Sequence, residues 1–325
     1  MNAFTSGLAA HIESLLALKH AMGLPYLASE RHLRGFDAMC SKDHPGQDIL
    51  TREMALAWAV GRPDEHVNTQ TRRITPVRQL AKHMIRVGVE AYLIAPGIPG
   101  PRIRYRPHLF THQQLRAVFD AADSVPLTPY GRSRHLIIPV IFRMIYCLGL
   151  RPGEARRLRR NDVDLIRGTV FIRESKGHKD RRVFMSADLC DYCRDYDHTI
   201  AAHHPNRVPF FPNHTGGFYS PSILSVWFHE LLSADPLLAA VTRHDSPPRP
   251  YDLRHAHVIE VINRCTLAGR DPEAFVAYLS MHLGHTNLDD TWYYFHLAPQ
   301  FHPDLREIAN TGIESILPEA DHGTQ

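Results

Sequence analysis

Apolar residues recur three or four positions apart through most of the first ninety residues, as they do on one face of an amphipathic helix. Four stretches show this spacing: residues 3–22, 26–40, 51–61 and 68–88. Thr51 is placed to cap the third helix. Pro76 lies inside the fourth, so that helix either starts near Thr75 or is kinked at the proline. These residues are therefore expected to form a small all-helical unit.

The pattern after residue 108 is mixed. Thr111 should cap a helix that ends near 122, and HLIIPVIFRMIYCLGL (135–150) is apolar enough on most faces for a buried central helix ended by Gly149. TVFIRES (169–175) and RRVFMS (181–186) alternate as two strands of a hairpin do. Helices resume at about 186–203, 221–234, 252–268 and 272–282. The predicted fold class is mainly α, with a small antiparallel sheet (α+β).

A Pro- and Gly-rich stretch, APGIPGPRIRYRP (95–107), separates the two patterns. It is typical of an interdomain linker, and 325 residues suit two domains better than one core. The predicted organisation is a helical domain (1–94), the linker (95–107), a larger domain (108–302) and a C-terminal tail (303–325). The linker arginines, Arg102, Arg104 and Arg106, are expected to bind DNA along the backbone; the alternative is a plain solvated linker.

Composition narrows the setting of the protein. No run of about 18 apolar residues occurs, and the first ten residues do not resemble a signal peptide, so a cytoplasmic, nucleoid-associated location without a membrane is expected. The five scattered cysteines suit a reducing compartment, and Cys190 and Cys193 lack a second pair to complete a zinc site. The net charge is only +3, yet just five of the 37 basic residues are lysine. Arginine forks suit phosphate contacts.

Five short motifs follow one another in the second domain. They are GLRPGEARRLRRNDVDL (149–165), ESKGHKDRRV (174–183), YDLRHAH (251–257), LGH (283–285) and WYY (292–294). Each occurs by chance in many chains, but together, in this order and spacing, they resemble the tyrosine recombinase or phage integrase family over about 108–300. The long N-terminal domain resembles transposon- or integron-associated recombinases more than compact type IB topoisomerases.

The resemblance implies a catalytic set for DNA strand cleavage. Tyr294, nine residues after His285, would be the nucleophile. Arg151 and Arg254 would be the clamp around the phosphate, because a phosphodiester attacked by a tyrosyl oxygen gains negative charge on its non-bridging oxygens. His285 would either hydrogen-bond such an oxygen or help to manage the tyrosine proton.

Two lysines could protonate the leaving 5′ oxygen as general acid. Lys176 is favoured because it directly follows the first strand of the hairpin. Lys179, three residues on, is the rival, and otherwise a DNA-binding residue.

Tyr251 departs from the family pattern, which has a histidine in HxxR where this chain has YDLR. A phenol can donate a hydrogen bond to a phosphate oxygen, but with an ordinary pKa of about 10 it is a poor base at neutral pH. Tyr251 therefore remains a candidate catalytic residue with an altered role.

The resemblance implies a site-specific DNA recombinase that works through a 3′-phosphotyrosyl intermediate and needs no metal or other cofactor. Its partners would be double-stranded DNA, held between the core-binding and catalytic domains, and further copies of the chain: a homotetramer on synapsed DNA, and a monomer or dimer when free. The C-terminal tail would contact a neighbouring copy or pack on its own domain. The alternatives are a DNA-binding architectural or regulatory protein with weakened catalysis, and a metal-dependent hydrolase that uses the histidines.

Overall fold

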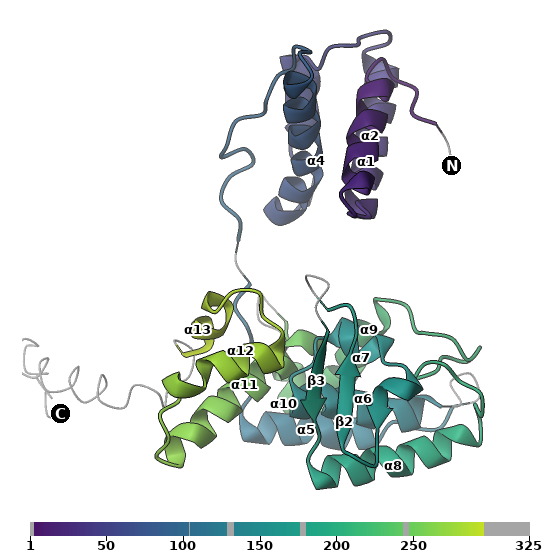
Figure 1. The fold of residues 1–325 in the computed structure, drawn as a ribbon, viewed down its shortest axis with the longest axis vertical. Helices are drawn as coiled ribbons and strands as arrows, with labels where there is room; N and C mark the ends of the chain where they lie inside the picture. Colours follow the sequence, from purple (N-terminus) through teal and green to yellow (C-terminus); the bar gives the residue numbers. More distant parts are fainter. Residues whose placement is uncertain (1–2, 104, 129–132, 176–179, 243–246, 296–325) are drawn as a thin grey trace, which may run out of the picture. The chain divides into compact units, whose positions relative to one another are not determined.

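The fold is mainly helical with a small antiparallel sheet, as the hydrophobic pattern predicts (Figure 1). The computed structural model of the chain describes residues 3–103, 105–128, 133–175, 180–242 and 247–295. The chain divides into two compact units between Tyr105 and Arg106, ten residues after the start of the Pro- and Gly-rich stretch. Each unit has its own apolar core, so each is described by itself.

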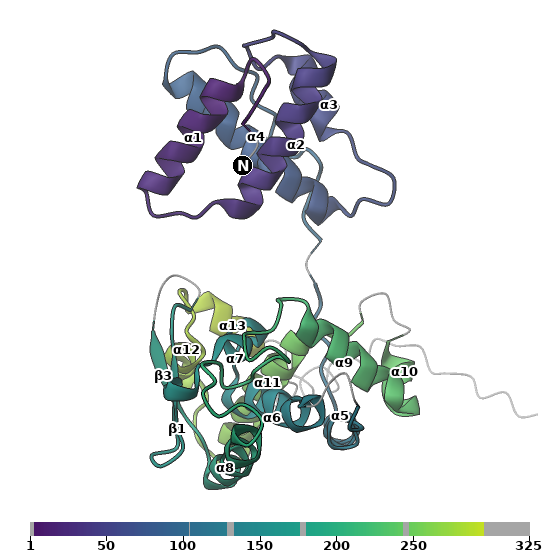
Figure 2. The same ribbon diagram turned by 90° about the vertical axis from the view of Figure 1, so that its right-hand side faces the viewer.

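The N-terminal unit consists of four helices, which Figures 1 and 2 show from two sides: α1 (Ala9–Ala21), α2 (Leu27–Asp43), α3 (Arg52–Ala59) and α4 (Val67–Arg86). Their apolar faces meet in a core in which Phe36 and Trp58 pack edge to face. Thr51 caps α3 as predicted, because its hydroxyl accepts a hydrogen bond from the Met54 amide.

Helix α4 runs without a break from Val67 through Pro76 to Arg86, so the alternative in which it starts near Thr75 is wrong. Proline lacks the N–H that would bond to the carbonyl one turn earlier. Its ring is buried in the core, and the hydroxyls of Thr71 and Thr75 donate to carbonyls one turn back. Burial of the surrounding face keeps the helix together in spite of the missing bond.

The first part of the predicted linker is held along α4. Arg78 donates from Nε to the carbonyl of Ile94 (3.1 Å) and from Nη2 to that of Ala95 (2.6 Å). The side-chain amide of Asn68 exchanges two hydrogen bonds with the backbone of Ile103, at 2.7 and 3.1 Å. Residues 94–103 therefore belong structurally to the N-terminal unit.

The C-terminal unit is built around α6 (Arg134–Leu148), which packs against α5 (His112–Asp123), α8 (Ala187–Ala201) and α11 (Pro250–Leu267). Nine residues of α6 are buried, and Gly149 ends it in the left-handed conformation (φ +60°), as predicted. The other helices are α7 (Pro152–Arg157), α9 (Ile223–Ala234), α10 (Pro236–Val241), α12 (Val276–Leu283) and α13 (Asp289–Phe295). Short 3₁₀ turns occur at Arg160–Asp162 and Glu273–Phe275.

The predicted hairpin is confirmed as β2 (Thr169–Ile172) and β3 (Arg181–Phe184), which pair antiparallel with Val170 opposite Val183. A short strand that was not predicted, β1 (Val163–Asp164), extends the sheet on the β2 side. Val170, Ile172 and Val183 point into the main core. The sheet is thereby anchored beside α7, at the end of α6.

Helices α11, α12 and α13 share a separate small core, and Figure 1 shows them together at one side of the C-terminal unit. Val258, Leu279 and Leu283 are among its buried members, and so is Tyr294. This packing fixes the short helix α13 on α11. None of the described helices is long and apolar enough to cross a bilayer.

Candidate active site

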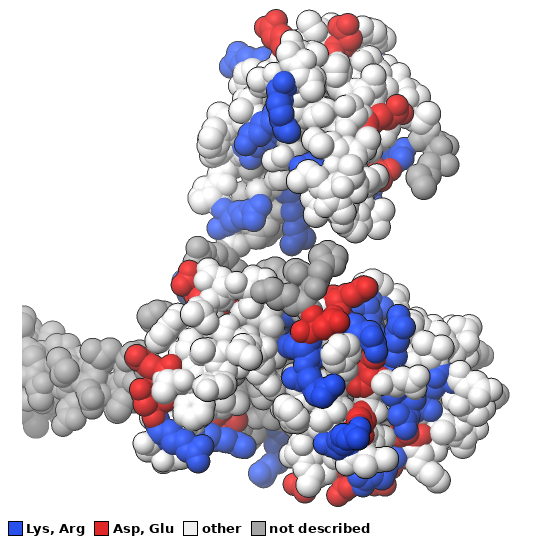
Figure 3. Space-filling view, in the orientation of Figure 1, with Lys and Arg blue, Asp and Glu red and all other residues white. Residues whose placement is uncertain are grey.

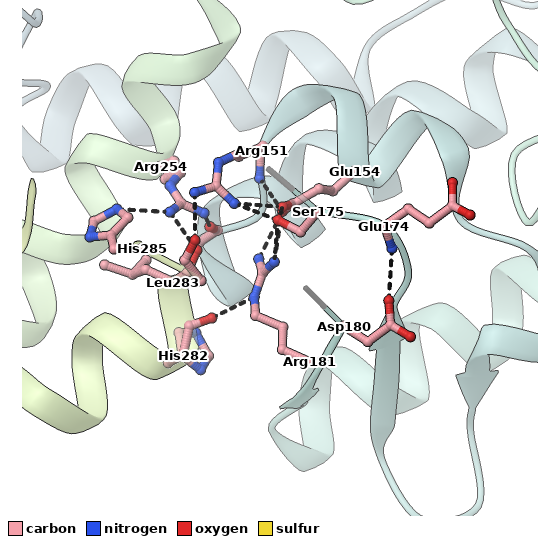
Figure 4. A network of polar contacts seen from close by, with 12 residues as sticks. Arg151, Glu154, Glu174, Ser175, Asp180, Arg181, Arg254, His282, Leu283 and His285 are labelled. Atoms are coloured by element: carbon pink, nitrogen blue, oxygen red, sulfur yellow. Dashed lines mark hydrogen bonds and ion pairs between the residues drawn. The ribbon is translucent and has the colours of Figure 1, made fainter. Parts of the chain in front are cut away.

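Arg151 lies where the chain leaves α6, at the N-cap position of α7. Its Nη1 donates to Oε1 of Glu154 and to Oγ of Ser175, both at 2.8 Å. Its Nη2 donates to the carbonyl of Gly284 (2.9 Å), so the side chain spans three segments that are far apart in the sequence (Figure 4). The guanidinium is therefore held in one orientation before any ligand binds.

Arg254 is the largest fully buried side chain of the described residues, with 0% exposure. It lies on α11 and donates to the carbonyls of Gly149 (2.5 Å) and Leu283 (2.7 Å). Its Nε–H has no hydrogen-bond partner, and burial lowers its pKa. A buried cation with an unused donor is poised to bind an anion.

Gly149 and Gly284 allow two turns to approach the site closely, and these turns carry the carbonyls to which Arg151 and Arg254 donate. Both have positive φ, at +60° and +65°. A Cβ at Gly149 would lie 2.6 Å from Cδ2 of His257, and one at Gly284 would lie 3.0 Å from Nη1 of Arg181. Glycine is therefore required at Gly149 by both conformation and space.

His285 follows the turn at Gly284 and points toward Arg254 in Figure 4. Its Nε2 lies 3.1 Å from Nη2 of Arg254, and its Nδ1 lies 2.7 Å from Oγ1 of Thr291. Burial, followed by the charges of Arg254 and Arg151, lowers the pKa of His285 to about 4. The imidazole is therefore neutral at pH 7.

Tyr294 lies on α13 and is only 3% exposed. Its ring is flanked by two histidine rings, with centroids 5.3 Å from His255 and 6.3 Å from His285. Burial raises the pKa of its phenol well above the ordinary value, and the charge and a hydrogen bond of Arg254 oppose that rise. Phosphoryl chemistry at this oxygen would therefore need both the nearby cation and a group to take the proton.

Tyr251 is the second residue of α11, one turn before Arg254 and His255. Its ring centroid is 5.9 Å from Cζ of Arg254 and 5.0 Å from the His255 ring. Burial and the charges of Arg254 and Arg249 lower the pKa of His255 to about 4. The phenol that replaces the motif histidine thus lies beside the buried arginine.

Glu154 is the hub of a second set of contacts. It accepts hydrogen bonds from the Arg151 backbone (2.8 Å), from Ser175 Oγ (2.7 Å) and from both terminal nitrogens of Arg181 (2.9 and 2.8 Å). Burial would raise the pKa of its carboxyl, but the hydrogen bonds and charge of Arg181 lower it to about 2. Arg181 also donates from Nε to the carbonyl of His282 (2.7 Å). Its side chain therefore joins β3, α7 and the end of α12.

The structure brings together five of the six residues predicted as catalytic: Arg151, Tyr251, Arg254, His285 and Tyr294. The sixth, Lys176, and the predicted DNA-binding residues Lys179 and Arg104 lie outside the described residues. Arg102 and Arg106 are exposed. Their assignments stay predictions.

Sequence reasoning did not identify Ser175, Arg181 or Thr291 as parts of the site. Ser175 and Arg181 lie within the quoted motif ESKGHKDRRV, and Thr291 lies one residue before WYY. Their closeness to the motif residues in the sequence indicates that they lie near the site, but it does not show which of their side chains point into it.

Basic side chains also gather outside the site. Arg156, Arg157, Arg159 and Arg173 line a cleft between α7 and β2, together with Phe171 and the acidic side chains of Glu154, Asp162 and Glu174. Figure 3 shows basic and acidic side chains intermixed over this part of the C-terminal unit. Within the described ranges, no group of three or more His, Cys, Asp or Glu side chains is arranged to hold a metal ion.

The chain belongs to the phage integrase family, whose model matches residues 108–300. Among its relatives is y4rB of Sinorhizobium fredii, which carries the provisional name integrase/recombinase. It is 28% identical over 296 residues, covering 89% of this chain and 92% of the relative. The tyrosine recombinase XerC of Halalkalibacterium halodurans is 26% identical over 255 residues, covering 75% of each chain.

Solved structures share the fold. The XerH site-specific recombinase bound to a palindromic difH substrate, in a post-cleavage complex, has a TM-score of 0.64 at 17% identity, covering 88% of this chain and 79% of that one. The integrase of the transposon Tn1549 in complex with a circular-intermediate DNA has a TM-score of 0.58 at 12% identity, covering 87% and 94%. At these identities the likeness concerns the fold.

Proposed function

We propose that this protein is a site-specific DNA recombinase that cleaves and rejoins DNA through a 3′-phosphotyrosyl intermediate at Tyr294. One observation carries the proposal. Four side chains from separate elements lie close together: Arg151 at the start of α7, Arg254 on α11, the neutral His285 after α12, and the buried Tyr294 on α13. The chain that brings them together belongs to the phage integrase family.

The chemistry follows from the positions of the cations. When the tyrosyl oxygen attacks, the phosphorus passes through a pentavalent arrangement, and negative charge builds up on its non-bridging oxygens. Arg151 is already oriented by Glu154 and Ser175, and Arg254 has an unused Nε–H in a buried setting. Donors fixed in this way stabilise the developing charge without reorganising, an effect typically worth 10²- to 10³-fold per donor.

The leaving 5′ oxygen needs a proton, and Lys176 is the proposed donor. Its predecessor Ser175 is buried and hydrogen-bonded to both Arg151 and Glu154. These bonds support the assignment, because they tie the residue before Lys176 to the side chain of Arg151. Lys179 remains the rival.

The N-terminal unit is proposed to be the core-binding domain. Polar and basic side chains recur along one stripe of α4, at Arg72, Thr75, Gln79, Lys82 and Arg86. Figure 3 shows basic side chains along the α4 side of this unit. A helix with such a stripe suits the major groove and its phosphates, and the exposed Arg102 and Arg106 suit backbone contacts.

Assembly and location are also part of the proposal. A homotetramer would form on synapsed DNA associated with the nucleoid, and a monomer or dimer would exist free of it. Both the XerH and the Tn1549 integrase structures contain DNA, which supports DNA as the partner here. The C-terminal tail, 303–325, lies outside the described residues.

The proposal is tested with a nicked suicide duplex made from DNA that flanks the gene. Wild-type protein should form an adduct that resists SDS, Tyr294→Phe should form none, and the neighbouring Tyr293→Phe should form it normally, because Tyr293 is 41% exposed. Arg151→Ala should slow adduct formation on the order of 10²-fold or more. Excess chelator should change nothing.

Two outcomes would contradict the proposal. An adduct that persists in Tyr294→Phe would place the nucleophile elsewhere. DNA binding without any adduct would favour the architectural or regulatory alternative.

A further inference from the structure

Two hydrogen bonds determine where His285 carries its proton. A guanidinium only donates, so Nε2 of His285, 3.1 Å from Nη2 of Arg254, is the bare nitrogen that accepts. The single proton of the neutral ring is then on Nδ1, and Nδ1–H donates to Oγ1 of Thr291 at 2.7 Å. The imidazole is therefore held as the Nδ1–H tautomer.

Thr291 is well placed to hold the imidazole ring in this orientation, because its hydroxyl accepts the Nδ1–H. It is fully buried, with 0% exposure, and lies on α13 one turn before Tyr294. Buried in this way, its hydroxyl is shielded from water that could compete for the imidazole. The charged groups that face His285 are Arg254 on α11, Arg151 at the start of α7, Arg181 on β3 and Asp290 on α13.

The reaction needs a proton acceptor near Tyr294. The phenol is buried and does not ionise readily, and the residue at the usual histidine position, Tyr251, is itself a phenol. A nitrogen base must therefore come from elsewhere. Two imidazoles flank the Tyr294 ring, those of His255 and His285.

His285 is the better placed of the two. Its orientation is fixed from both sides, by Thr291 and by Arg254. His255 has no comparable anchor, because its Nδ1 is buried without a hydrogen-bond partner and its Nε2 is 4.0 Å from Asp252.

We propose that Thr291 is a positioning residue that makes His285 the proton acceptor for Tyr294, a role that rests on the proposed recombinase function. The scissile phosphate takes over a hydrogen bond of Arg254 and so frees the Nε2 lone pair. The Tyr294 oxygen then bonds to phosphorus and its proton passes to Nε2. The bond from phosphorus to the 5′ oxygen breaks, and that oxygen takes a proton from the general acid. Religation returns both protons.

The test compares Thr291→Val, which keeps the shape but removes the hydroxyl, with Thr291→Ser, which keeps the hydroxyl. In single-turnover cleavage of the suicide duplex, Thr291→Val should be slower on the order of 10²-fold, the usual scale of general base catalysis. Thr291→Ser should stay within a few fold of wild type. DNA affinity should be the same for all three proteins, since Thr291 is fully buried.

A double-mutant cycle separates this role from simple packing. In a His285→Ala background, adding Thr291→Val should cause no further loss. Additive losses would overturn the proposal, and so would a cleavage rate in Thr291→Val equal to that of wild type. A loss in His255→Ala that exceeds the loss in His285→Ala would move the base to the other face of Tyr294.

The tautomer can be checked without DNA. The ¹⁵N NMR signals of His285 in the wild-type protein should report Nδ1–H in a hydrogen bond, and in Thr291→Val the Nδ1–H signal should lose the shift that its hydrogen bond to Oγ1 causes. An Nε2–H signature in the wild type would overturn the proposal. If the wild-type protein made no adduct dependent on Tyr294, the proposed function would fail, whereas the NMR result would still decide whether Thr291 holds the Nδ1–H of His285.

Discussion

Tyr251 is the residue at which this chain departs from the HxxR pattern, and its surroundings define what a phenol can do there. The ring lies beside Arg254 and His255, at 5.9 and 5.0 Å. A phenol donates one hydrogen bond and is a weak base. Its expected contribution is therefore a hydrogen bond to a phosphate oxygen, with proton transfer left to an imidazole.

Replacement of Tyr251 tests this division of roles. Tyr251→Phe keeps the ring but removes the hydroxyl, so adduct formation should slow by roughly the value of one hydrogen bond to a charged group, about 1.5–3 kcal/mol or 10- to 100-fold. Tyr251→His should be tolerated because it restores a donor. Equal cleavage by wild type and Tyr251→Phe on the suicide duplex would refute a hydrogen-bonding role.

The motif residues could be predicted from the sequence, whereas the residues that hold them in position could not. Arg151, Arg254, His285 and Tyr294 could be found because each belongs to a short motif at a fixed spacing. Thr291 bonds to His285, 6 positions away. Arg181 bonds to Glu154, 27 positions away, and to the His282 carbonyl, 101 positions away. A threonine or arginine in a sequence does not reveal such a partner before the chain is folded.

At the scale of elements, a buried ion pair anchors the hairpin to the site. Arg181 on β3 forms a two-pronged contact with Glu154 on α7, at 2.9 and 2.8 Å, and both side chains are nearly inaccessible to solvent. Ser175, three residues after the end of β2, bonds to the same carboxylate at 2.7 Å. Both arms of the hairpin therefore converge on a single buried acid.

Removal of this arginine should destabilise the C-terminal unit more than loss of a surface charge would. Arg181→Met leaves the carboxylate of Glu154 buried without its main cation, which typically costs about 3–5 kcal/mol. The neighbour Arg182 is exposed, so Arg182→Met is a matched control that should change stability by less than about 0.5 kcal/mol.

Pulse proteolysis in urea measures this effect, because it scores each compact unit separately on a gel. The midpoint for the C-terminal unit should fall in Arg181→Met and stay in place in Arg182→Met. Equal midpoints would mean that Glu154 finds another partner.

Long elements followed from the hydrophobic pattern and short ones did not. Helices such as α6 and α11 are long enough for several turns of periodicity, and Gly149 and Thr51 marked ends correctly. The six-residue helices α7 and α10 and the two-residue strand β1 are too short to show a period. Pro76 misled in part because burial of α4 outweighs the local preference of proline.

At the scale of the molecule, the C-terminal unit buries several histidines in the neutral state. Burial and the charge of His282 lower the pKa of His257 to about 3, and the pKa of His255 and of His285 is about 4. In the unfolded chain these groups titrate near 6.5. Between about pH 4 and pH 6.5 the unfolded state therefore binds more protons than the folded state, so stability falls as the pH falls through this range.

Each such histidine contributes a slope of about 1.4 kcal/mol per pH unit. Hydrogen exchange of α11 amides in the intact chain, corrected for the intrinsic rate, should show markedly weaker protection at pH 5 than at pH 6.5. His257→Gln should reduce this difference, and His198→Gln, at an exposed position, should not. Equal protection at both pH values would show that the histidines are already charged in the folded protein.

The attachment of residues 94–103 to α4 bears on how relatives of this protein can be recombined with one another. Asn68 is hydrogen-bonded to the backbone of Ile103, and Arg78 to that of Ile94 and Ala95. A hybrid enzyme joined at residue 94 would therefore separate residues 94–103 from the helix α4 on which they pack. A junction placed after Ile103 transfers α4 and residues 94–103 together. N-terminal units exchanged between relatives should therefore be cut there, downstream of Pro96, Pro99 and Pro101 and not in front of them.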